Sequence, residues 1–184
     1  MTDRTEEPGA ERVTESQRIY EGRIANLRID QVELPDGRRS AREIVEHAPV
    51  VAVVPLEEDG DVILVRQYRL ATASVMLEVP AGLIDPGESP EEAAQRELQE
   101  EIKMRAESME PLPGFYASPG FLDEYIYVFL ATGLVESHAD GDDDEDIVIV
   151  RMPLAEALRL IEAGEIRDGK SITGLLLAAR RRGV

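Results

Sequence analysis

The sequence predicts an α+β fold, and three observations carry that prediction. Short segments with alternating or continuous apolar character, typical of strands, fill residues 18–80. A strongly helical segment follows near residues 90–104, and two more helical segments lie close to the C-terminus. Strands and helices therefore mix without the regular βαβ alternation of a parallel sheet. With 184 residues, 43% of them hydrophobic, the chain is large enough to bury a core.

The first 48 residues divide into a tail and a small β subdomain. Residues 1–16 are polar and charged and contain Pro8 and Gly9, so we expect a disordered acidic tail. Residues 17–48 read RIYEGRIANLRIDQVEL, then the turn PDGR, then REIVEH, which predicts a β-hairpin.

Residues 49–184 are predicted to form the main domain, which begins with strands. VVAVVPL at 50–56 is a nearly continuous apolar run, as expected of a buried strand. VILVRQYR at 62–69 predicts a second strand, and SVMLEVPAG predicts a third that ends at Pro80.

The strongest helix prediction covers residues 90–104. Ser89 is the expected N-cap, Pro90 takes the first helical position, and two glutamates follow in the first turn. Beyond it, MEPLPGFYASPG is expected to be irregular and ESHADGDDDED to be an acidic loop. Strands are expected at DEYIYVFLATGL and IVIVRMPL, and helices at PLAEALRLIEAGEI and SITGLLLAARRR.

Composition excludes several classes of protein. The chain has no cysteine, which excludes disulfides and thiolate chemistry, and its two histidines, His47 and His138, make a histidine-rich zinc site improbable. Neither an 18-residue apolar run nor an N-terminal signal peptide is present, so we expect a cytoplasmic protein with no membrane partner.

The formal net charge of −18 argues against a nucleic-acid partner, which needs a basic surface. Bound divalent cations would reconcile such a charge with an anionic substrate. The alternative is that the charge only keeps the protein soluble.

One stretch, AGLIDPGESPEEAAQRELQEEI at 81–102, concentrates glutamates. Glu97, Glu100 and Glu101 are three and four residues apart and share one face of the predicted helix. Oxygen ligands of this kind suit Mg²⁺ or Mn²⁺, and the preceding turn brings carbonyls such as that of Ala81 to the same face. An ordinary solvated helix face is the alternative reading of three glutamates alone.

The spacing in this stretch resembles the Nudix box, GX5EX7REUXEEXGU, where U is aliphatic. Gly82, Glu88 and the run from Arg96 to Glu101 occupy its fixed positions. At average residue usage, such a match arises by chance in about one chain of this length in 10⁵. One departure is Lys103, which stands where the family has a second glycine that ends the helix in a left-handed turn.

The resemblance implies a Nudix fold, a mixed sheet sandwiched between helices, and hydrolysis of a nucleoside diphosphate linked to another group. It implies that Glu97 and Glu101 are the principal ligands of Mg²⁺, with Mn²⁺ as a possible substitute, and that Glu100 and the Ala81 carbonyl support them. We also expect Glu88 and Arg96 to form an ion pair that orients the cluster. Arg96 and Glu100 are therefore assigned to the catalytic set.

Flanking segments resemble the ADP-ribose pyrophosphatase subfamily. They include REIVEH, VAVVPL, LVRQYR, LEVPAGLIDPGE and SPGFLDE, and Pro119 lies 15 residues after Met104, where that subfamily has a marker proline. The resemblance implies hydrolysis of ADP-ribose to AMP and ribose 5-phosphate. The alternatives are another nucleotide sugar, a dinucleotide or an oxidised nucleotide as substrate, or a non-catalytic nucleotide-binding module.

The same resemblance implies substrate contacts from Arg42, Arg69, Glu78 and Gly120. Arginine suits both base stacking and phosphate binding. Exposed strand residues without such a role are the alternative for Arg42, Arg69 and Glu78. An adenine-stacking aromatic residue is not evident, since Ile24 and Ala25 stand where relatives often have one.

The resemblance places the general base in the acidic loop after the marker proline and points to Glu145, with Asp146 as the fallback. It also implies a homodimer in which the segment before VAVVPL is exchanged between subunits.

Overall fold

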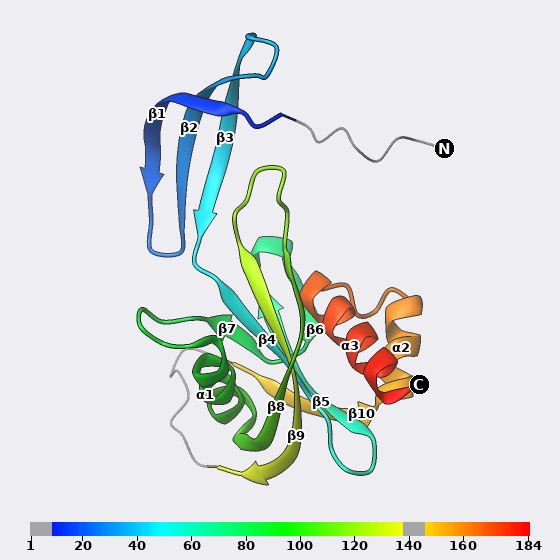
Figure 1. Cartoon of the computed structure of the whole chain (residues 1–184). Coiled ribbons are helices and arrows are strands. Elements are labelled where there is room, and N and C mark those ends of the chain that lie inside the picture. Colours follow the sequence, from blue (N-terminus) through cyan, green and yellow to red (C-terminus); the bar gives the residue numbers. More distant parts are fainter. Residues whose placement is uncertain (1–8, 138–145) are drawn as a thin grey trace, which may run out of the picture. The chain divides into compact units, whose positions relative to one another are not determined.

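A computed structural model of the chain describes residues 9–137 and 146–184 (Figure 1). These residues fall into two compact units. The first extends to Ala48 and also contains Ser118–Glu124, and the second comprises Pro49–Ala117 and Tyr125–Val184. Each unit is described below by itself.

The first unit is a three-stranded antiparallel sheet in the order β1-β2-β3. Its strands are β1 (Arg12–Glu21), β2 (Ala25–Glu33) and β3 (Arg39–His47). The predicted hairpin is confirmed as β2–β3, whose turn is closed by a hydrogen bond of 2.8 Å from the Leu34 amide to the Arg38 carbonyl.

Strand β1 corrects the expected tail, because residues 12–16 belong to it. Its first residue, Arg12, pairs with Glu33 of β2. All ten residues of β1 are exposed, so the strand has no apolar alternation that a sequence reading could detect. Backbone pairing with β2 orders it instead. Residues 1–8 lie outside the described residues.

The segment Ser118–Glu124 runs beside the end of β3. The Val45 amide donates to the Phe121 carbonyl at 2.7 Å, and the Asp123 amide donates to the Val45 carbonyl at 3.2 Å. Two predicted substrate residues, Gly120 of this segment and Arg42 of β3, therefore belong to the same unit.

The second unit contains two sheets. One is antiparallel, in the order β10-β5-β6, and the other is mixed, in the order β7-β4-β9-β8, with β4 and β9 parallel. The strands are β4 (Val50–Pro55), β5 (Asp61–Arg69), β6 (Ser74–Glu78), β7 (Ala81–Leu83), β8 (Met104–Tyr116), β9 (Tyr125–Glu136) and β10 (Val148–Pro153).

Helices cover both faces of these sheets (Figure 1). They are α1 (Pro90–Ile102), α2 (Leu154–Glu162) and α3 (Gly169–Arg182), with a short 3-10 helix, η1 (Leu70–Thr72). None of the helices within residues 9–137 and 146–184 has the length and apolar character that a bilayer span requires.

Strand β4 confirms the prediction of a buried strand, since all six of its residues are buried. Ala52 and Val54 pack into the core beneath α2 and α3, whereas Val51 and Val53 pack into a second core beneath α1. Burial on both faces explains why its sequence is apolar without alternation.

Strand β8 corrects the expectation that MEPLPGFYASPG is irregular for residues 109–116, whereas residues 117–120 lie outside any strand. This strand lies at the edge of the mixed sheet and pairs only with β9 within that sheet. An edge strand tolerates proline because one side of its backbone needs no ladder partner. Pro111 and Pro113 therefore do not break it.

Helix α1 ends at Ile102, two residues earlier than expected. Its C-cap is Lys103, which adopts a left-handed conformation with φ 58° and ψ 35°. Lysine thus takes the backbone conformation that a glycine would take without strain.

We predict that Lys103→Gly stabilises the protein by about 0.5–1 kcal/mol. Relief of left-handed strain outweighs the extra entropy that glycine gives the unfolded chain. Urea unfolding would measure the change. The control is Gly164→Ala, which introduces the same strain at φ 72° in open space and should destabilise. A Lys103→Gly protein no more stable than wild type, beside a destabilised Gly164→Ala protein, would contradict the prediction.

Candidate active site

The start of helix α1 is fixed by its own side chains. Ser89 and Glu92 form a capping box, in which the Ser89 amide donates to Glu92 Oε2 at 2.8 Å and the Glu92 amide donates to Ser89 Oγ at 3.3 Å. Pro90 occupies the first helical position. The predicted start of the helix is confirmed, and it sets which side chains face the sheet.

Two of the three glutamates lie on the buried side of α1. Glu97 and Glu101 are each 7% exposed and belong to the buried stripe that includes Leu98, whereas Glu100 is partly exposed. Carboxylates one turn apart repel each other, and burial strengthens that repulsion. The arrangement therefore requires positive charge close by.

Arg96 provides part of that charge. Its Nε and Nη2 bind the two carboxylate oxygens of Glu88, each at 3.0 Å, which confirms the predicted ion pair. Its Nη1 donates to Glu97 Oε1 at 2.6 Å and to Glu100 Oε2 at 2.9 Å. Nη2 also donates to the Leu83 carbonyl at 2.8 Å, which ties the helix to the end of β7.

These contacts fix the charge states around Arg96. The hydrogen bond to Glu88 contributes most to raising the pKa of Arg96, so the guanidinium stays charged. The same hydrogen bond lowers the pKa of Glu88. A permanently charged fork of this kind holds planar carboxylates in a defined orientation.

Gly82 makes room for the Glu97 carboxylate. A Cβ atom on residue 82 would overlap the Oε1, Cδ and Oε2 atoms of Glu97. Any other residue would therefore displace Glu97 or the strand β7, and this close approach gives the glycine its physical reason.

The carbonyl of Ala81 lies at the free edge of the mixed sheet. Hydrogen bonds from the Val53 amide to the Pro80 carbonyl, 2.9 Å, and from the Ile84 amide to the Pro49 carbonyl, 3.0 Å, set the register of β7 on β4. Ala81 and Ala52 then form a non-hydrogen-bonded pair. Because β7 is an edge strand, the Ala81 carbonyl points away from β4 and has no ladder partner there.

A second charged group lies at the end of β6. Arg69 binds Glu78 through two hydrogen bonds of 2.9 Å, and the Lys170 ammonium lies 2.5 Å from Glu78 Oε2. Burial acts to raise the pKa of Glu78, but Arg69 and Lys170 outweigh it and lower that pKa. Hydrogen bonding to Glu78 is the main cause that raises the pKa of Arg69, and the charge of Glu101 adds to it.

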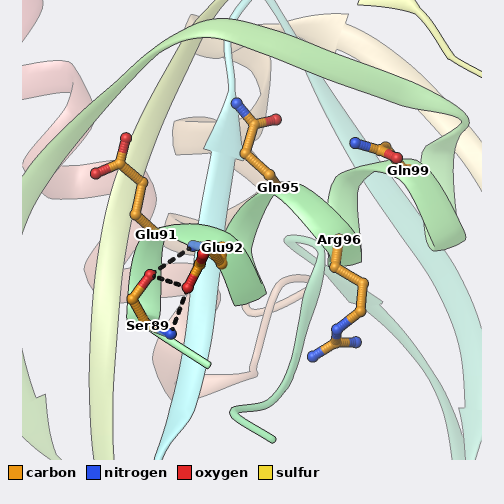
Figure 2. A pocket seen from close by; sticks show the side chains of 6 residues that line it. All are labelled: Ser89, Glu91, Glu92, Gln95, Arg96 and Gln99. Atoms are coloured by element: carbon orange, nitrogen blue, oxygen red, sulfur yellow. Dashed lines mark hydrogen bonds between the residues drawn. The ribbon is translucent and has the colours of Figure 1, made fainter. Parts of the chain in front are cut away.

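An open hollow of about 480 Å³ lies along α1 (Figure 2). Its lining residues are Ser89, Glu91, Glu92, Gln95, Arg96 and Gln99. In Figure 2 the Arg96 side chain turns away from Gln95 and Gln99. Glu97 and Glu101 are buried and do not line this hollow, so we place the candidate chemistry at the buried side of the helix instead.

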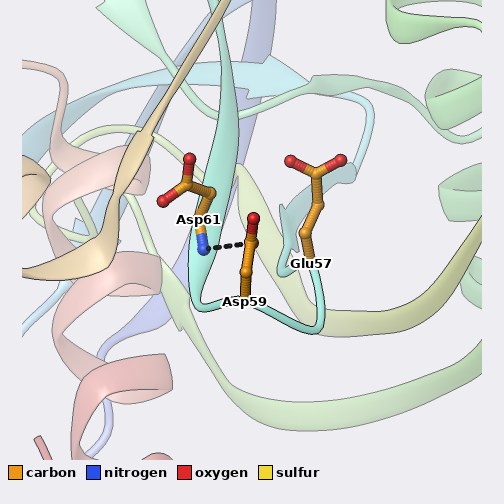
Figure 3. A group of neighbouring side chains, drawn as sticks. All are labelled: Glu57, Asp59 and Asp61. Atoms are coloured by element: carbon orange, nitrogen blue, oxygen red, sulfur yellow. Dashed lines mark hydrogen bonds between the residues drawn. The ribbon is translucent and has the colours of Figure 1, made fainter.

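A separate acidic group lies in the turn between β4 and β5 (Figure 3). Oxygens of Glu57, Asp59 and Asp61 lie within 4.8 Å of one another. Asp59 is exposed, and its Oδ1 accepts a hydrogen bond of 3.2 Å from the Asp61 amide. Glu57 of this turn also lies 3.5 Å from Arg151 Nε, so one of the three carboxylates already has a cationic partner.

Comparison with known families identifies both parts of the chain. Residues 46–174 match the model described as NUDIX domain. The chain belongs to the Nudix family. Residues 11–45 of this Nudix protein match a second model, described as nucleoside diphosphate sugar hydrolase N-terminal domain. The predicted Nudix fold is thereby confirmed.

Relatives of this Nudix protein are similar over most of their length. An ADP-ribose pyrophosphatase of Bacillus subtilis is 39% identical over 163 residues, 88% of each chain. A methanol dehydrogenase activator of Bacillus methanolicus is 40% identical over 164 residues, 88% of this chain and 89% of that one. A crystal structure of an ADP compounds hydrolase superposes with a TM-score of 0.87 at 27% identity and covers 97% of this chain and 99% of the other.

The donor atoms of the Nudix box fit a hard divalent cation. Glu97 and Glu101 offer two buried carboxylates on one stripe, and the neighbouring strand offers the Ala81 carbonyl at its free edge. Oxygen-only donors are the set that Mg²⁺ and Mn²⁺ prefer. Glu100 lies on the partly exposed flank and is held by Arg96.

The predicted site residues divide between the two units. The second unit contains the box, Arg69 and Glu78, whereas Arg42 and Gly120 lie in the first unit. In that unit Arg42 donates to Glu11 at 2.9 Å through Nε. Glu145, the expected general base, lies outside the described residues.

Sequence reasoning missed Lys170, which lies 92 positions from its partner Glu78. The only local signal was an N-cap aspartate, Asp168, before the last helix.

We predict that Gly82→Ala weakens Mn²⁺ binding at least about tenfold, the range typical of lost support around a metal site. The added methyl displaces the Glu97 carboxylate. The electron paramagnetic resonance signal of free Mn²⁺ would measure the affinity. Gly169→Ala, where the methyl enters open space, is the control and should bind as wild type does. A folded Gly82→Ala protein with unchanged affinity would refute the role of Glu97.

Proposed function

We propose that this protein is a divalent-cation-dependent hydrolase that cleaves the diphosphate of ADP-ribose to AMP and ribose 5-phosphate. The observation that carries the proposal is the pair of buried carboxylates, Glu97 and Glu101, with the Arg69–Glu78 group in the same unit. The similarity to the ADP-ribose pyrophosphatase of Bacillus subtilis supports ADP-ribose as the substrate.

In this proposal, each residue has a task set by its geometry. Glu97, Glu101 and the Ala81 carbonyl hold the cation, Mg²⁺ in preference and Mn²⁺ as a substitute. When bound, the cation polarises the diphosphate and makes water a better nucleophile. Arg96 keeps the carboxylates of Glu97 and Glu100 in place, and Arg69 binds the diphosphate through the part of its guanidinium that Glu78 does not use.

The bond changes are those of a hydrolysis. An oxygen–phosphorus bond forms to water, and the bond from that phosphorus to the bridging oxygen breaks. The water proton passes to a general base, for which we retain Glu145 from the family resemblance and Asp146 as its fallback. Arg42 and Gly120 are retained as proposed substrate contacts, and a cytoplasmic location remains a prediction.

A second candidate function comes from the relative named methanol dehydrogenase activator. In that case the chain would activate a partner dehydrogenase. Purified protein that releases AMP and ribose 5-phosphate from ADP-ribose without any partner favours the first candidate. Protein that requires an added dehydrogenase for any effect favours the second.

We further propose a homodimer formed through the first unit. Among its described residues only Asp30 and Val32 are buried, while Tyr20 of β1, which pairs with Leu27 and shares a sheet face with it and with Ile29, is exposed. A three-stranded sheet needs an apolar face covered by another layer to be stable. A second copy of the chain would supply that layer.

The dimer is tested by sedimentation equilibrium. We predict twice the chain mass for wild type and a shift toward the monomer for Tyr20→Glu, because a charge would then enter the apolar contact. Glu58→Lys, at an exposed position of the second unit, is the charge control. A monomeric wild-type protein would overturn the dimer.

We predict that Glu101→Gln lowers turnover of ADP-ribose by about a hundredfold or more, because a neutral amide is a poor ligand for a hard cation. Release of AMP and ribose 5-phosphate is measured with Mg²⁺ and with EDTA. Glu91→Gln, an exposed position in the first turn of the same helix, should retain activity. Near-normal turnover by folded Glu101→Gln protein, or EDTA-resistant turnover by wild type, would exclude the proposed chemistry.

A further inference from the structure

The first turn of α3 contributes a half-buried cation, Lys170, to the group around Glu78. The Lys170 side chain is 14% exposed, and its ammonium lies 2.5 Å from Glu78 Oε2 and 3.0 Å from Asp168 Oδ2. Glu78 itself is 2% exposed. A lysine so enclosed has an electrostatic partner rather than a solvated surface position.

The position of Lys170 is fixed by a rigid frame. Asp168 caps α3, accepting hydrogen bonds from the Ser171 amide at 2.9 Å and from Ser171 Oγ at 2.5 Å. Ser171 is fully buried, and its Oγ accepts a hydrogen bond of 2.8 Å from the Val79 amide. The residue after Glu78 is thus tied to the residue after Lys170, so the two charged side chains meet in one geometry.

Glu78 is shared by two cations. Arg69 takes Oε1 through Nε and Oε2 through Nη2, and Lys170 also takes Oε2. Together with Asp168, the group contains two positive and two negative charges. Loss of Lys170 would leave one excess negative charge beside Arg69.

Arg69 has capacity for a further anion. Its side chain is 42% exposed, and its hydrogen bonds within residues 9–137 and 146–184 use Nε and Nη2, so Nη1 remains available. The attraction of this guanidinium for a diphosphate depends on how much of its charge Glu78 cancels. Lys170 competes for that same carboxylate.

We propose that Lys170 is a positioning residue for substrate: by sharing Glu78 with Arg69, it leaves Arg69 oriented and positive toward the diphosphate. This inference rests on the proposed function. Lys170 acts through Glu78 and Arg69, without itself contacting the reacting atoms. The last helix is thereby part of the substrate-binding group.

The inference predicts that loss of Lys170 weakens the binding of ADP-ribose but not the binding of Mn²⁺. In Lys170→Met, the charge-assisted contact of Arg69 with the diphosphate should be lost. The KM for ADP-ribose should therefore rise about tenfold. Turnover should change less than twofold, because Arg69 binds ground and transition states alike. Mn²⁺ affinity without substrate should stay equal or increase, because the site becomes more negative. Lys170→Arg should restore the KM to within about twofold of wild type.

The matched control is Arg181→Met, which removes the 2.7 Å ion pair with Glu110 at the other end of the same helix. It should leave KM, turnover and Mn²⁺ affinity unchanged. A purely structural role for Lys170 predicts instead that KM, Mn²⁺ affinity and melting temperature all deteriorate together in Lys170→Met. That pattern, or an unchanged KM, would overturn the inference.

Calorimetry with inorganic pyrophosphate separates this inference from the proposed function. Wild-type protein that fails to hydrolyse ADP-ribose overturns the proposed function. Pyrophosphate affinity about tenfold weaker in Lys170→Met than in wild type would still support the role of Lys170 toward a diphosphate. Equal pyrophosphate affinity in the two proteins would overturn that role.

Discussion

Burial of two like charges on the apolar stripe of α1 is the constraint around which the second unit is organised. Glu97 and Glu101 lie one turn apart beside Leu98, where water screens their repulsion poorly. Arg96 offsets part of that repulsion and fixes Glu97, and its bidentate contact with Glu88 fixes Arg96 in turn. Residue 82 is a glycine because the Glu97 carboxylate occupies the space that a Cβ atom would fill there. The repulsion that remains is what a divalent cation would relieve.

The rest of the second unit places complementary groups around that constraint. Strand β7 is short and lies at a sheet edge, which leaves the Ala81 carbonyl pointing outward. The end of β6 carries Glu78, which gathers Arg69 and Lys170 from two distant parts of the chain. Two hydrophobic cores, one under α1 and one under α2 and α3, pack the strands of this unit against its helices. Arg69, Arg96 and Lys170 thus give this acidic chain positive charge beside its buried carboxylates.

Local chemistry made part of this structure predictable. Ser89, Pro90 and Glu92 specify the start of α1 through contacts within four residues, and the apolar run of β4 reflects burial on both faces. Strands β1 and β8 were not foreseen. The first has no apolar alternation, and the second contains prolines that only its edge position permits. Lys170 could not be inferred because its partner lies 92 residues away and no local pattern marks the pairing.

The most direct test of the account is where a divalent cation binds. Crystals grown with Mn²⁺ and measured at the manganese absorption edge would locate each ion by anomalous scattering. The account predicts a peak enclosed by Glu97, Glu101 and the Ala81 carbonyl. A peak only at the turn of Glu57, Asp59 and Asp61, or none within the second unit, would contradict it, because the buried carboxylates of α1 would then have no cation to bind.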